Sequence, residues 1–271
     1  DKSELIRYAA TFIDENQTAK ILSAKESINI FKQYGKNAEF VFSIIEKISV
    51  VTKMLSKLFQ QKHLNAVTTV IHVRFLYVAI QMQDDIDTKL KNKLLKQWER
   101  VSFRIFGLAD KDSRTLVGPY VRLAQKIVHR RDEQLGCEFM PTEFFQNLIE
   151  LGKDYEIETI VKSLKAKDLY FKNNWKEELR YFFYKREVWL CKKEGINISD
   201  AVWNEIWSTS TNNTIEHICP QNAYKLTDWS GNFSDQKEIE KNIHRLGNLV
   251  ILTKEANILA SNNPFSVKKA I

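Results

Sequence analysis

The feature that most constrains this chain is the scarcity of helix-breaking residues in its first 200 positions. Only eight glycines and four prolines occur in 271 residues, and Pro119 and Pro141 are the only prolines before residue 200. Proline removes a backbone donor and clashes inside a helix, so a stretch this poor in proline can carry long uninterrupted helices. We therefore expect a mainly α fold, with the first 200 residues nearly all helical.

Residue spacing in this region favours the same structure. Ser23 and Glu26 are spaced as a capping box, which predicts that a helix begins there. One stripe of side chains recurs at alternating four- and three-residue steps and predicts a core-facing helix: Val41, Ile45, Ile48, Thr52, Leu55 and Phe59. Further helical patterns cover residues 63–82, 87–106, 114–131, 142–151, 155–170 and 174–192.

The character of the sequence changes after residue 207. Residues 208–214 are small and polar without periodicity, which indicates a loop or linker. Two short apolar runs follow, over 215–220 and 249–252, and each suits a strand. Thr253 can then cap a short helix. The tail is thus expected to be strand, loop, strand and helix.

We therefore predict two domains, a helical domain over 1–207 and a small domain over 208–271. The formal net charge of +7 lies entirely in residues 1–200, because basic and acidic residues balance in the rest. Basic residues cluster from Lys89 to Arg104 and again from Lys162 to Lys193, where aromatic residues are interleaved. A phosphate backbone would bind such surfaces. The alternative is that they are solvated faces of helices whose aromatic faces are core.

Several classes of protein are excluded by the composition. The longest apolar runs, such as Phe75 to Ile80, are far shorter than the roughly 20 residues of a membrane span, and no signal-peptide pattern opens the chain. Cys137, Cys191 and Cys219 are scattered, which argues against a disulfide framework and against a cysteine-rich zinc site. We expect a cytoplasmic protein without a membrane role. Since the first residue is Asp1, we also expect that the chain is part of a longer protein.

The segments that carry chemistry lie in the tail, which holds two of the five histidines. They read Glu216-His217-Ile218-Cys219-Pro220-Gln221, then His244-Arg245-Leu246-Gly247-Asn248-Leu249, then Asn257 and Ser261-Asn262. Across about residues 213–266 the chain resembles an HNH nuclease, a small ββα-metal (His-Me finger) domain. More narrowly, it is similar to the C-terminal nuclease domain of GmrSD-type modification-dependent restriction enzymes.

A second stretch, over residues 103–123, resembles the helical region that precedes the nuclease in the same family. Family members usually carry a nucleotide-dependent sensing domain at the N-terminus. No G-x-x-x-x-G-K-[ST] phosphate loop occurs in this sequence. The resemblance therefore implies that an upstream sensing domain is a partner absent from this chain.

The resemblance assigns catalytic roles that suit the residue types. His217, largely neutral at cellular pH, would take the proton of the attacking water. Asn248 would accept a hydrogen bond from the other ring nitrogen of His217 and so orient the ring. Glu216 and Asn257 would hold a single Mg²⁺ or Mn²⁺, since such ions prefer a few oxygen ligands completed by water and substrate. Many HNH enzymes have a histidine where this chain has Asn257, and the change favours Mg²⁺ over zinc.

The remaining candidates have open alternatives. His244 would bind phosphate, assist the leaving group or hold the fold together by hydrogen bonds. Arg245, Lys254 and Asn262 are candidates for contacts to nucleic acid. Arg245 is equally explained as a solvated side chain, and Ser261-Asn262 as the C-terminal cap of a helix.

We accordingly predict a metal-dependent DNA endonuclease that nicks or cuts DNA, as the effector of an anti-phage restriction system. Its DNA would be phage or modified DNA, and the helical domain would hold DNA or relay a signal. One alternative is a non-catalytic DNA-binding or docking module with a decayed nuclease fold. The intact set of Glu216, His217, Asn248 and Asn257 argues against it. The other alternative is an RNA-cleaving toxin, which no aromatic-rich RNA-reading motif supports.

Overall fold

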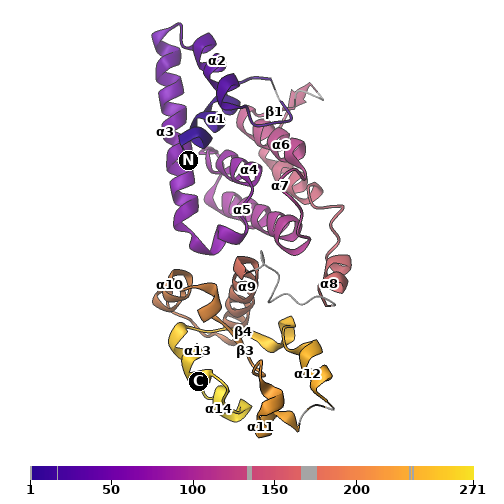
Figure 1. Ribbon diagram of the computed structural model, residues 1–271. Coiled ribbons are helices and arrows are strands. Elements are labelled where there is room, and N and C mark those ends of the chain that lie inside the picture. The colour runs from indigo at the N-terminus through magenta and orange to yellow at the C-terminus, as the bar shows by residue number, and fades with distance from the viewer. Residues whose placement is uncertain (1, 17, 133–135, 166–175, 232, 234) are drawn as a thin grey trace. The chain divides into compact units, whose positions relative to one another are not determined.

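A computed structural model of the chain describes residues 2–16, 18–132, 136–165, 176–231, 233 and 235–271 (Figure 1). The described chain is mainly helical, which confirms the predicted α class. It divides into two compact units, Asp1–Ile157 and Glu158–Ile271. No helix in the described ranges is long and apolar enough to cross a membrane.

The first unit is an assembly of helices with one pair of very short strands. The strands are β1 (Arg131–Asp132) and β2 (Cys137–Glu138), which pair antiparallel. Short turns of helix cover η1 (Lys62–Ala66) and η2 (Phe103–Leu108). The α-helices are α1 (Lys2–Ile13), α2 (Ala24–Tyr34), α3 (Ala38–Gln60), α4 (Ile71–Gln81), α5 (Thr88–Ser102), α6 (Val117–His129) and α7 (Pro141–Glu150).

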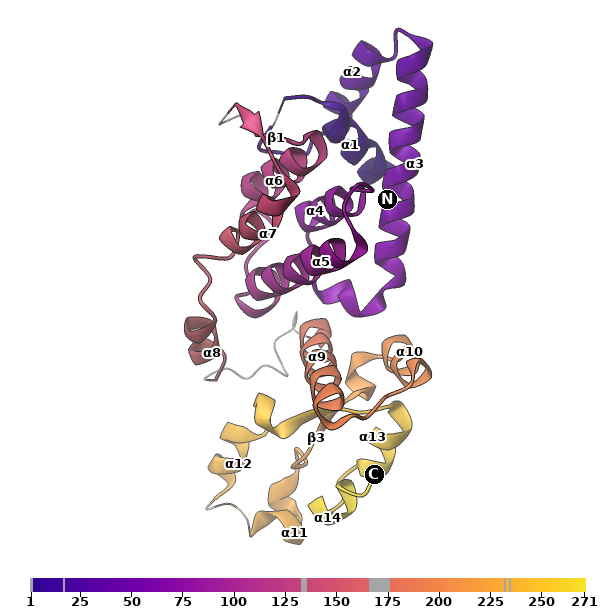
Figure 2. The ribbon, with the colours of Figure 1, turned by 180° about the vertical axis from the view of Figure 1, so that it is seen from behind.

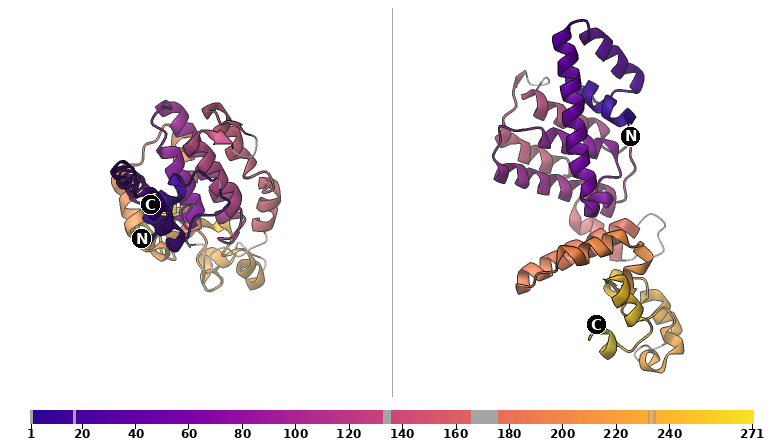
Figure 3. Two further views of the ribbon diagram at one scale, coloured as in Figure 1. Left: turned by 90° about the horizontal axis from the view of Figure 1, so that it is seen from above. Right: turned by 90° about the vertical axis from the view of Figure 1, so that its left-hand side faces the viewer.

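Helix α4 is the centre of the first unit. It packs against α3, α5 and α6, and the long α3 runs along one side of the unit (Figures 1 and 3). Residues Val73 and Phe75 to Ile80 of α4 are almost fully buried. Trp98 of α5 is also buried and donates its indole N–H to the Val73 carbonyl at 2.9 Å. The apolar stretch that is too short for a membrane span is thus a core helix.

His72 on α4 is one of the histidines outside the tail, and it is completely buried. Its ring lies edge-on to the rings of Phe106 and Tyr120, at centroid distances of 5.5 and 5.2 Å. Burial lowers the pKa of His72 to about 4; the backbone of Thr115 acts in the opposite direction and the charge of Arg74 in the same direction as burial. His72 therefore packs in the core as a neutral ring.

Two local predictions for the first unit are wrong in detail. The stripe predicted as core is mostly exposed, since Val41, Ile45 and Phe59 are 40%, 57% and 51% exposed, whereas Leu55 is buried. Helix α2 contacts the first half of α3, where the Tyr34 and Phe40 ring centroids lie 5.9 Å apart, but it leaves Val41 and Ile45 of the stripe exposed. The helix predicted over 63–82 is broken, because a 3₁₀ turn ends at Ala66 and α4 begins only at Ile71.

Other helix signals are confirmed. The Ser23 hydroxyl accepts the Glu26 N–H at 3.3 Å and the Glu26 carboxylate accepts the Ser23 N–H at 2.8 Å, which is the predicted capping box at the start of α2. The helices predicted over 87–106, 114–131 and 142–151 correspond to α5, α6 and α7. Parts of the two patterns at 155–170 and 174–192 lie outside the described residues.

The second unit contains the tail. Its helices are α8 (Ile157–Lys165), α9 (Lys176–Glu194), α10 (Asp200–Ser208), α11 (Thr227–Ser230), α12 (Gln236–Asn242), α13 (Lys254–Ala260) and α14 (Phe265–Lys268). Strands β3 (Ile215–His217) and β4 (Leu249–Ile251) pair antiparallel. In two opposite views α11 and α12 lie on one side of this strand pair and α13 and α14 on the other (Figures 1 and 2).

The segment between the strands was expected to be a loop, but it contains α11, α12 and single turns of 3₁₀ helix. A small apolar cluster fixes these turns around Trp229 and Ile239, both almost fully buried. Cys219 belongs to this cluster as a small buried side chain.

The division into units falls before α9, whereas the sequence placed a boundary at 207/208. Helix α9 is tied to the tail, because Arg180 donates to the carbonyls of Ile206 and Thr209 at 3.0 and 2.8 Å. Glu177 accepts the Thr211 hydroxyl at 3.1 Å and also pairs with Arg180. That 208–271 is a nuclease domain by itself stays a prediction.

Candidate active site

The pairing of β3 with β4 brings the motif segments 216–221 and 244–249 next to each other. Its register places His217 opposite Leu249, and the Ile218 N–H donates to the Asn248 carbonyl at 2.8 Å just beyond the strands. Apolar side chains at Ile215 and Ile251 are buried under the pair. His217 is therefore the last strand residue, held next to the turn that precedes β4.

The His217 ring is nearly buried and is contacted on both of its nitrogens. Its Nε2 lies 3.0 Å from Nδ1 of His244, and its Nδ1 lies 3.5 Å from Nε2 of Gln221. The residue is 4% exposed. Burial lowers the pKa of His217 to about 4, and the charges of His244 and Lys268 act in the same direction. The ring is thus neutral at physiological pH.

The contact with the Gln221 amide favours one tautomer of His217. With Gln221 donating its amide N–H, the Nδ1 atom of His217 is unprotonated and the ring proton sits on Nε2. Nε2–H then donates to Nδ1 of His244. The basic nitrogen of His217 in this arrangement is Nδ1.

The Asn248 side chain bonds to backbone groups. Its Oδ1 accepts the Cys219 N–H at 2.7 Å, while its Nδ2 donates to the carbonyls of Cys219 at 2.9 Å and Ile243 at 2.8 Å. The structure forms these hydrogen bonds in place of the one expected with the His217 ring, and a catalytic part for Asn248 stays a prediction. Asn248 therefore fixes the turn that follows His217.

Glu216 precedes His217 in β3, and its carboxylate contacts helix α14. Its Oε1 accepts a hydrogen bond from the Lys268 ammonium at 2.6 Å, and the same ammonium donates to the His217 carbonyl at 2.8 Å. Both side chains are largely buried, with 14% of Glu216 and 6% of Lys268 exposed. Helix α14 is thus tied to the strand that carries the two candidate residues.

Asn257 lies one turn into α13, which packs against β3. Thr253 caps this helix as predicted, accepting the Ala256 N–H at 3.2 Å. Ala256, Asn257 and Ala260 are the less exposed residues of α13, so Asn257 lies on its inner face. Its side-chain amide makes no hydrogen bond within the described part of the chain.

The three candidate contacts to nucleic acid are not brought together. Lys254 is exposed at the start of α13, and Asn262 is exposed just beyond its end. Arg245 is half-buried in the turn before β4. Ser261 caps α13 with a positive φ of 37° and donates its N–H to the Asn257 carbonyl, so the cap explanation of Ser261 is confirmed.

The oxygens of Glu216 and Asn257 are of the kind that a hard divalent cation prefers, and that the two residues hold such an ion together stays a prediction. Glu216 Oε1 is held by Lys268, whereas Oε2 has no hydrogen-bond partner among the described residues. The Asn257 amide is also uncommitted there. No cluster of three or more His, Cys, Asp or Glu that could hold a metal occurs in that part of the chain. Two oxygen ligands with water and substrate completing the shell suit Mg²⁺ and not a zinc site.

Two residues that the sequence left without a role contact the candidate site. Gln221 belongs to the quoted motif, and it lies against the His217 ring. Lys268 was given no function, because nothing in the sequence distinguishes it from its neighbour Lys269. Its partner Glu216 is 52 residues away in the chain.

A comparison with protein families gives one match. Residues 162–271 match the family model described as GmrSD restriction endonucleases, C-terminal domain. The predicted similarity to the C-terminal region of these enzymes is confirmed, over a segment that is less than half of the chain. Residues 103–123 lie outside the matched segment. No curated protein and no solved structure matches the chain.

Proposed function

We propose that this chain is a metal-dependent DNA endonuclease whose reaction centre is built from His217, Glu216 and Asn257. The observation that carries the proposal is the neutral, buried His217 at the end of β3, within the segment that matches a restriction endonuclease domain. The order of β3, β4 and α13 is that of a ββα-metal finger. The resemblance further supports a role as the effector of an anti-phage restriction system in the cytoplasm, with phage or modified DNA as the substrate.

His217 supplies the proton acceptor. Hydrolysis needs a water in line with the scissile P–O bond, and its proton passes to Nδ1 of His217 as the water oxygen attacks phosphorus. The hydrogen bond from Nε2–H to His244 fixes the tautomer in which Nδ1 is basic. The bond to the 3′ oxygen breaks and this oxygen takes a proton from solvent water, which leaves a 3′ hydroxyl and a 5′ phosphate. His244 is thus a positioning residue in this proposal.

Glu216 and Asn257 provide the oxygens that would hold Mg²⁺ or Mn²⁺. When bound, the ion stabilises negative charge on the phosphate and on the departing oxygen. Asn248, just before β4, ties the backbone that follows His217 to the backbone at Ile243 through three hydrogen bonds. Gln221 lies beside the His217 ring and contacts its Nδ1.

The His217 ring must become more accessible when DNA binds than it is in the free protein. A ring that is 4% exposed cannot reach a water next to a phosphate without a local movement. Gln221 is exposed and lies next to Nδ1 of His217. Its side chain is therefore the group that would move aside when the substrate binds. Catalytic hydrogen bonds commonly tighten only in the substrate complex.

The test is relaxation of supercoiled plasmid by the full chain, with Mg²⁺ or with a chelator. We expect nicked or linear product only with the metal, and none with His217→Ala. His63→Ala, in the first unit, is the matched histidine control and retains cleavage. The nicked product should be sealed by DNA ligase, because ligase needs a 3′ hydroxyl and a 5′ phosphate.

Each result separates the alternatives. Equal relaxation by the parent and His217→Ala contradicts the proposed site. Metal-dependent cleavage of a structured RNA, with plasmid left intact, would identify the RNA-cleaving alternative. Binding of plasmid without any cleavage, in the presence of Mg²⁺ or Mn²⁺, would identify the decayed module.

A further inference from the structure

The first unit carries an open pocket of about 720 Å³ along α5. Its charged lining comes from one face of the helix, at Lys89, Lys93, Lys96 and Arg100, and Phe145 of α7 forms the opposite wall. All four cationic residues are exposed, and Lys93 places its ammonium 4.1 Å from the centre of the Phe145 ring. We call these five residues the α5 groove.

The structure separates this groove from the other basic residues of the cluster seen in the sequence. Lys91 points elsewhere, donating to the Gln81 carbonyl at 3.2 Å and lying 3.7 Å from Asp84. Arg104 donates to the Gly152 carbonyl at 3.0 Å. These two residues serve the fold of the first unit, so the solvated-face explanation does not cover the cluster as a whole.

The charges of the α5 groove are not neutralised by the protein. None of its four cations forms an ion pair within the described ranges, and the cation–π contact of Lys93 leaves its charge in place. The single acidic residue of α5, Glu99, lines an adjoining pocket with Gln61, Tyr77 and Lys96, so Lys96 borders both pockets. No acidic residue lines the groove.

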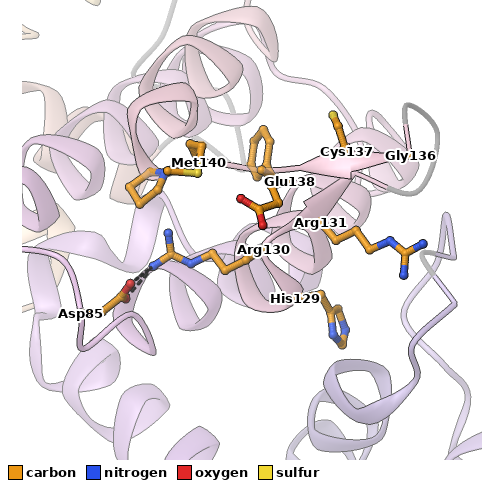
Figure 4. A pocket seen from close by; sticks show the side chains of 10 residues that line it. Asp85, His129, Arg130, Arg131, Gly136, Cys137, Glu138 and Met140 are labelled. Carbon is orange, nitrogen blue, oxygen red and sulfur yellow. Dashed lines mark hydrogen bonds and ion pairs between the residues drawn. The ribbon is translucent and has the colours of Figure 1, made fainter.

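A pocket of about 680 Å³ at β1 and β2 differs from the α5 groove in the charges that line it (Figure 4). It also contains arginines, but the Arg130 guanidinium is held by both oxygens of Asp85 at 2.5 and 2.7 Å. The Glu138 carboxylate adds a negative charge to the same pocket. An anion would have to displace these carboxylates, whereas the α5 groove requires no such exchange.

The spacing of the four cations fits a polyanion with a regular repeat. Positions i, i+4, i+7 and i+11 share one helix face, and at about 1.5 Å per residue they extend over about 16 Å. Successive phosphates of one DNA strand rise by about 3.4 Å along the axis and also wind about it, so they lie about 7 Å apart and about three to four are within reach of these four long side chains.

We propose that the α5 groove binds the sugar-phosphate backbone of DNA, without reading its sequence. The choice of DNA over RNA rests on the proposed nuclease function, whereas the phosphate contacts rest on the groove alone. The four cations would contact successive phosphates of one strand, and Phe145 would contact the sugar or base edges beside them. The groove holds substrate and takes no part in the cleavage chemistry.

The test is the salt dependence of DNA binding by the full chain, measured as anisotropy of a short labelled duplex. The chain carries His217→Ala and the buffer contains a chelator, so that no DNA is cut. Four phosphate contacts contribute about 3 to 4 to the slope of log K against log salt. Replacing Lys89, Lys93, Lys96 and Arg100 by Gln should remove this contribution and weaken binding at about 50 mM salt by at least tenfold.

A matched variant replaces Lys32, Lys36, Lys53 and Lys57 by Gln. These four lysines are exposed on α2 and α3 and at the turn between them, so the net charge changes equally. We expect its salt slope to fall by less than about 1. An equal fall in both variants would show that only the overall charge matters, and would overturn the proposal.

Competition identifies the class of ligand. Unlabelled duplex should displace the probe far better than polyglutamate at the same concentration of charge, and equal displacement would overturn the proposal in favour of an acidic protein. RNA that displaces the probe as well as DNA supports the phosphate contacts and removes the preference for DNA. This result is independent of cleavage, so a groove that fails leaves the His217 experiment standing, and the reverse also holds.

Discussion

His217 and His244 lie ring to ring, with Nε2 of the first 3.0 Å from Nδ1 of the second and the planes at 84°. The two residues come from opposite ends of the segment that joins β3 to β4. This contact fixes the ring of a strand-end histidine that burial keeps neutral. The ring partner of His217 in the structure is thus His244, whereas Asn248 was expected from the sequence.

The first prediction concerns His244. His244→Ala removes the acceptor for Nε2–H of His217, so the productive tautomer loses its preference and the cleavage rate should fall by about tenfold to a hundredfold, as for other groups that orient a reacting side chain. We expect kcat to fall while KM for plasmid changes little. His244→Gln, which keeps an acceptor, should recover part of the rate. A rise in KM with kcat unchanged would show that His244 binds DNA.

The second prediction concerns Asn248, whose side chain bonds to backbone groups. Asn248→Ala removes the partners of three backbone groups around Cys219 and Ile243, which should lower the free energy of unfolding of the second unit by about 2–3 kcal/mol. Thermal melting followed by tryptophan fluorescence measures this loss, and the buried Trp229 is a reporter within the second unit. Asn262→Ala is the control, since Asn262 is exposed. Parent-like melting with loss of cleavage would restore the original catalytic assignment.

Lys268 should weaken metal binding at Glu216. Its ammonium lies 2.6 Å from Oε1, and a unit charge at about 4 Å opposes another by about 4 kcal/mol at an effective dielectric constant of about 20. Lys268→Met should therefore tighten Mn²⁺ binding by at least about tenfold, whereas Glu216→Gln weakens it. The measurement is Mn²⁺ titration by electron paramagnetic resonance, without DNA.

Two controls separate charge from packing in the Lys268 experiment. Lys268→Arg keeps the charge and should leave Mn²⁺ affinity near that of the parent. Lys269→Met changes the exposed neighbouring lysine and should have no effect. If Lys268→Met binds Mn²⁺ no better than Lys269→Met, Glu216 is not a ligand or Lys268 does not oppose the ion.

His72 predicts a pH dependence of stability in the first unit. Its folded pKa of about 4 lies below the ordinary value of 6.5, so the unfolded chain binds a proton that the folded chain does not between these values. The free energy of unfolding should therefore fall as the pH is lowered from 6.5 to 4, by up to about 3 kcal/mol from this group. His72→Phe should lack this part of the loss.

The His72 measurement is the difference between two denaturant curves. Other groups titrate over the same range in both proteins, so only the difference between parent and His72→Phe reports on His72. An identical fall with pH in both proteins would contradict the neutral buried ring. The absolute stability of His72→Phe does not enter the comparison.

The sequence predicted what local spacing controls. Ser23 with Glu26 and Thr253 with Ala256 form the expected caps, because a cap joins atoms only three residues apart. The two short strands and the helix behind them also lie where apolar runs and turn residues placed them. The stripe from Val41 to Phe59 failed, because periodicity gives the face of a helix but not the presence of a neighbour to cover it.

The sequence predicted which residues belong to the candidate site but not which side chains they contact. His217, Glu216 and Asn257 were found through a resemblance, and their assignment stays a prediction. The Lys268 and His244 contacts join residues 51 and 27 positions from His217, and no local pattern reports such pairs. The sequence could not predict the hydrogen-bond partners of Asn248, because an amide can bond to backbone groups or to an imidazole equally well.

The most direct test of the account is the single-turnover rate of DNA cleavage at saturating Mg²⁺. With enzyme in excess over a labelled plasmid, we expect His217→Ala to lower the rate by about 10²- to 10⁴-fold, as for loss of a general base, while His63→Ala cleaves at the parental rate. A His217→Ala protein that is folded and cleaves as fast as the parent would contradict the account at its centre.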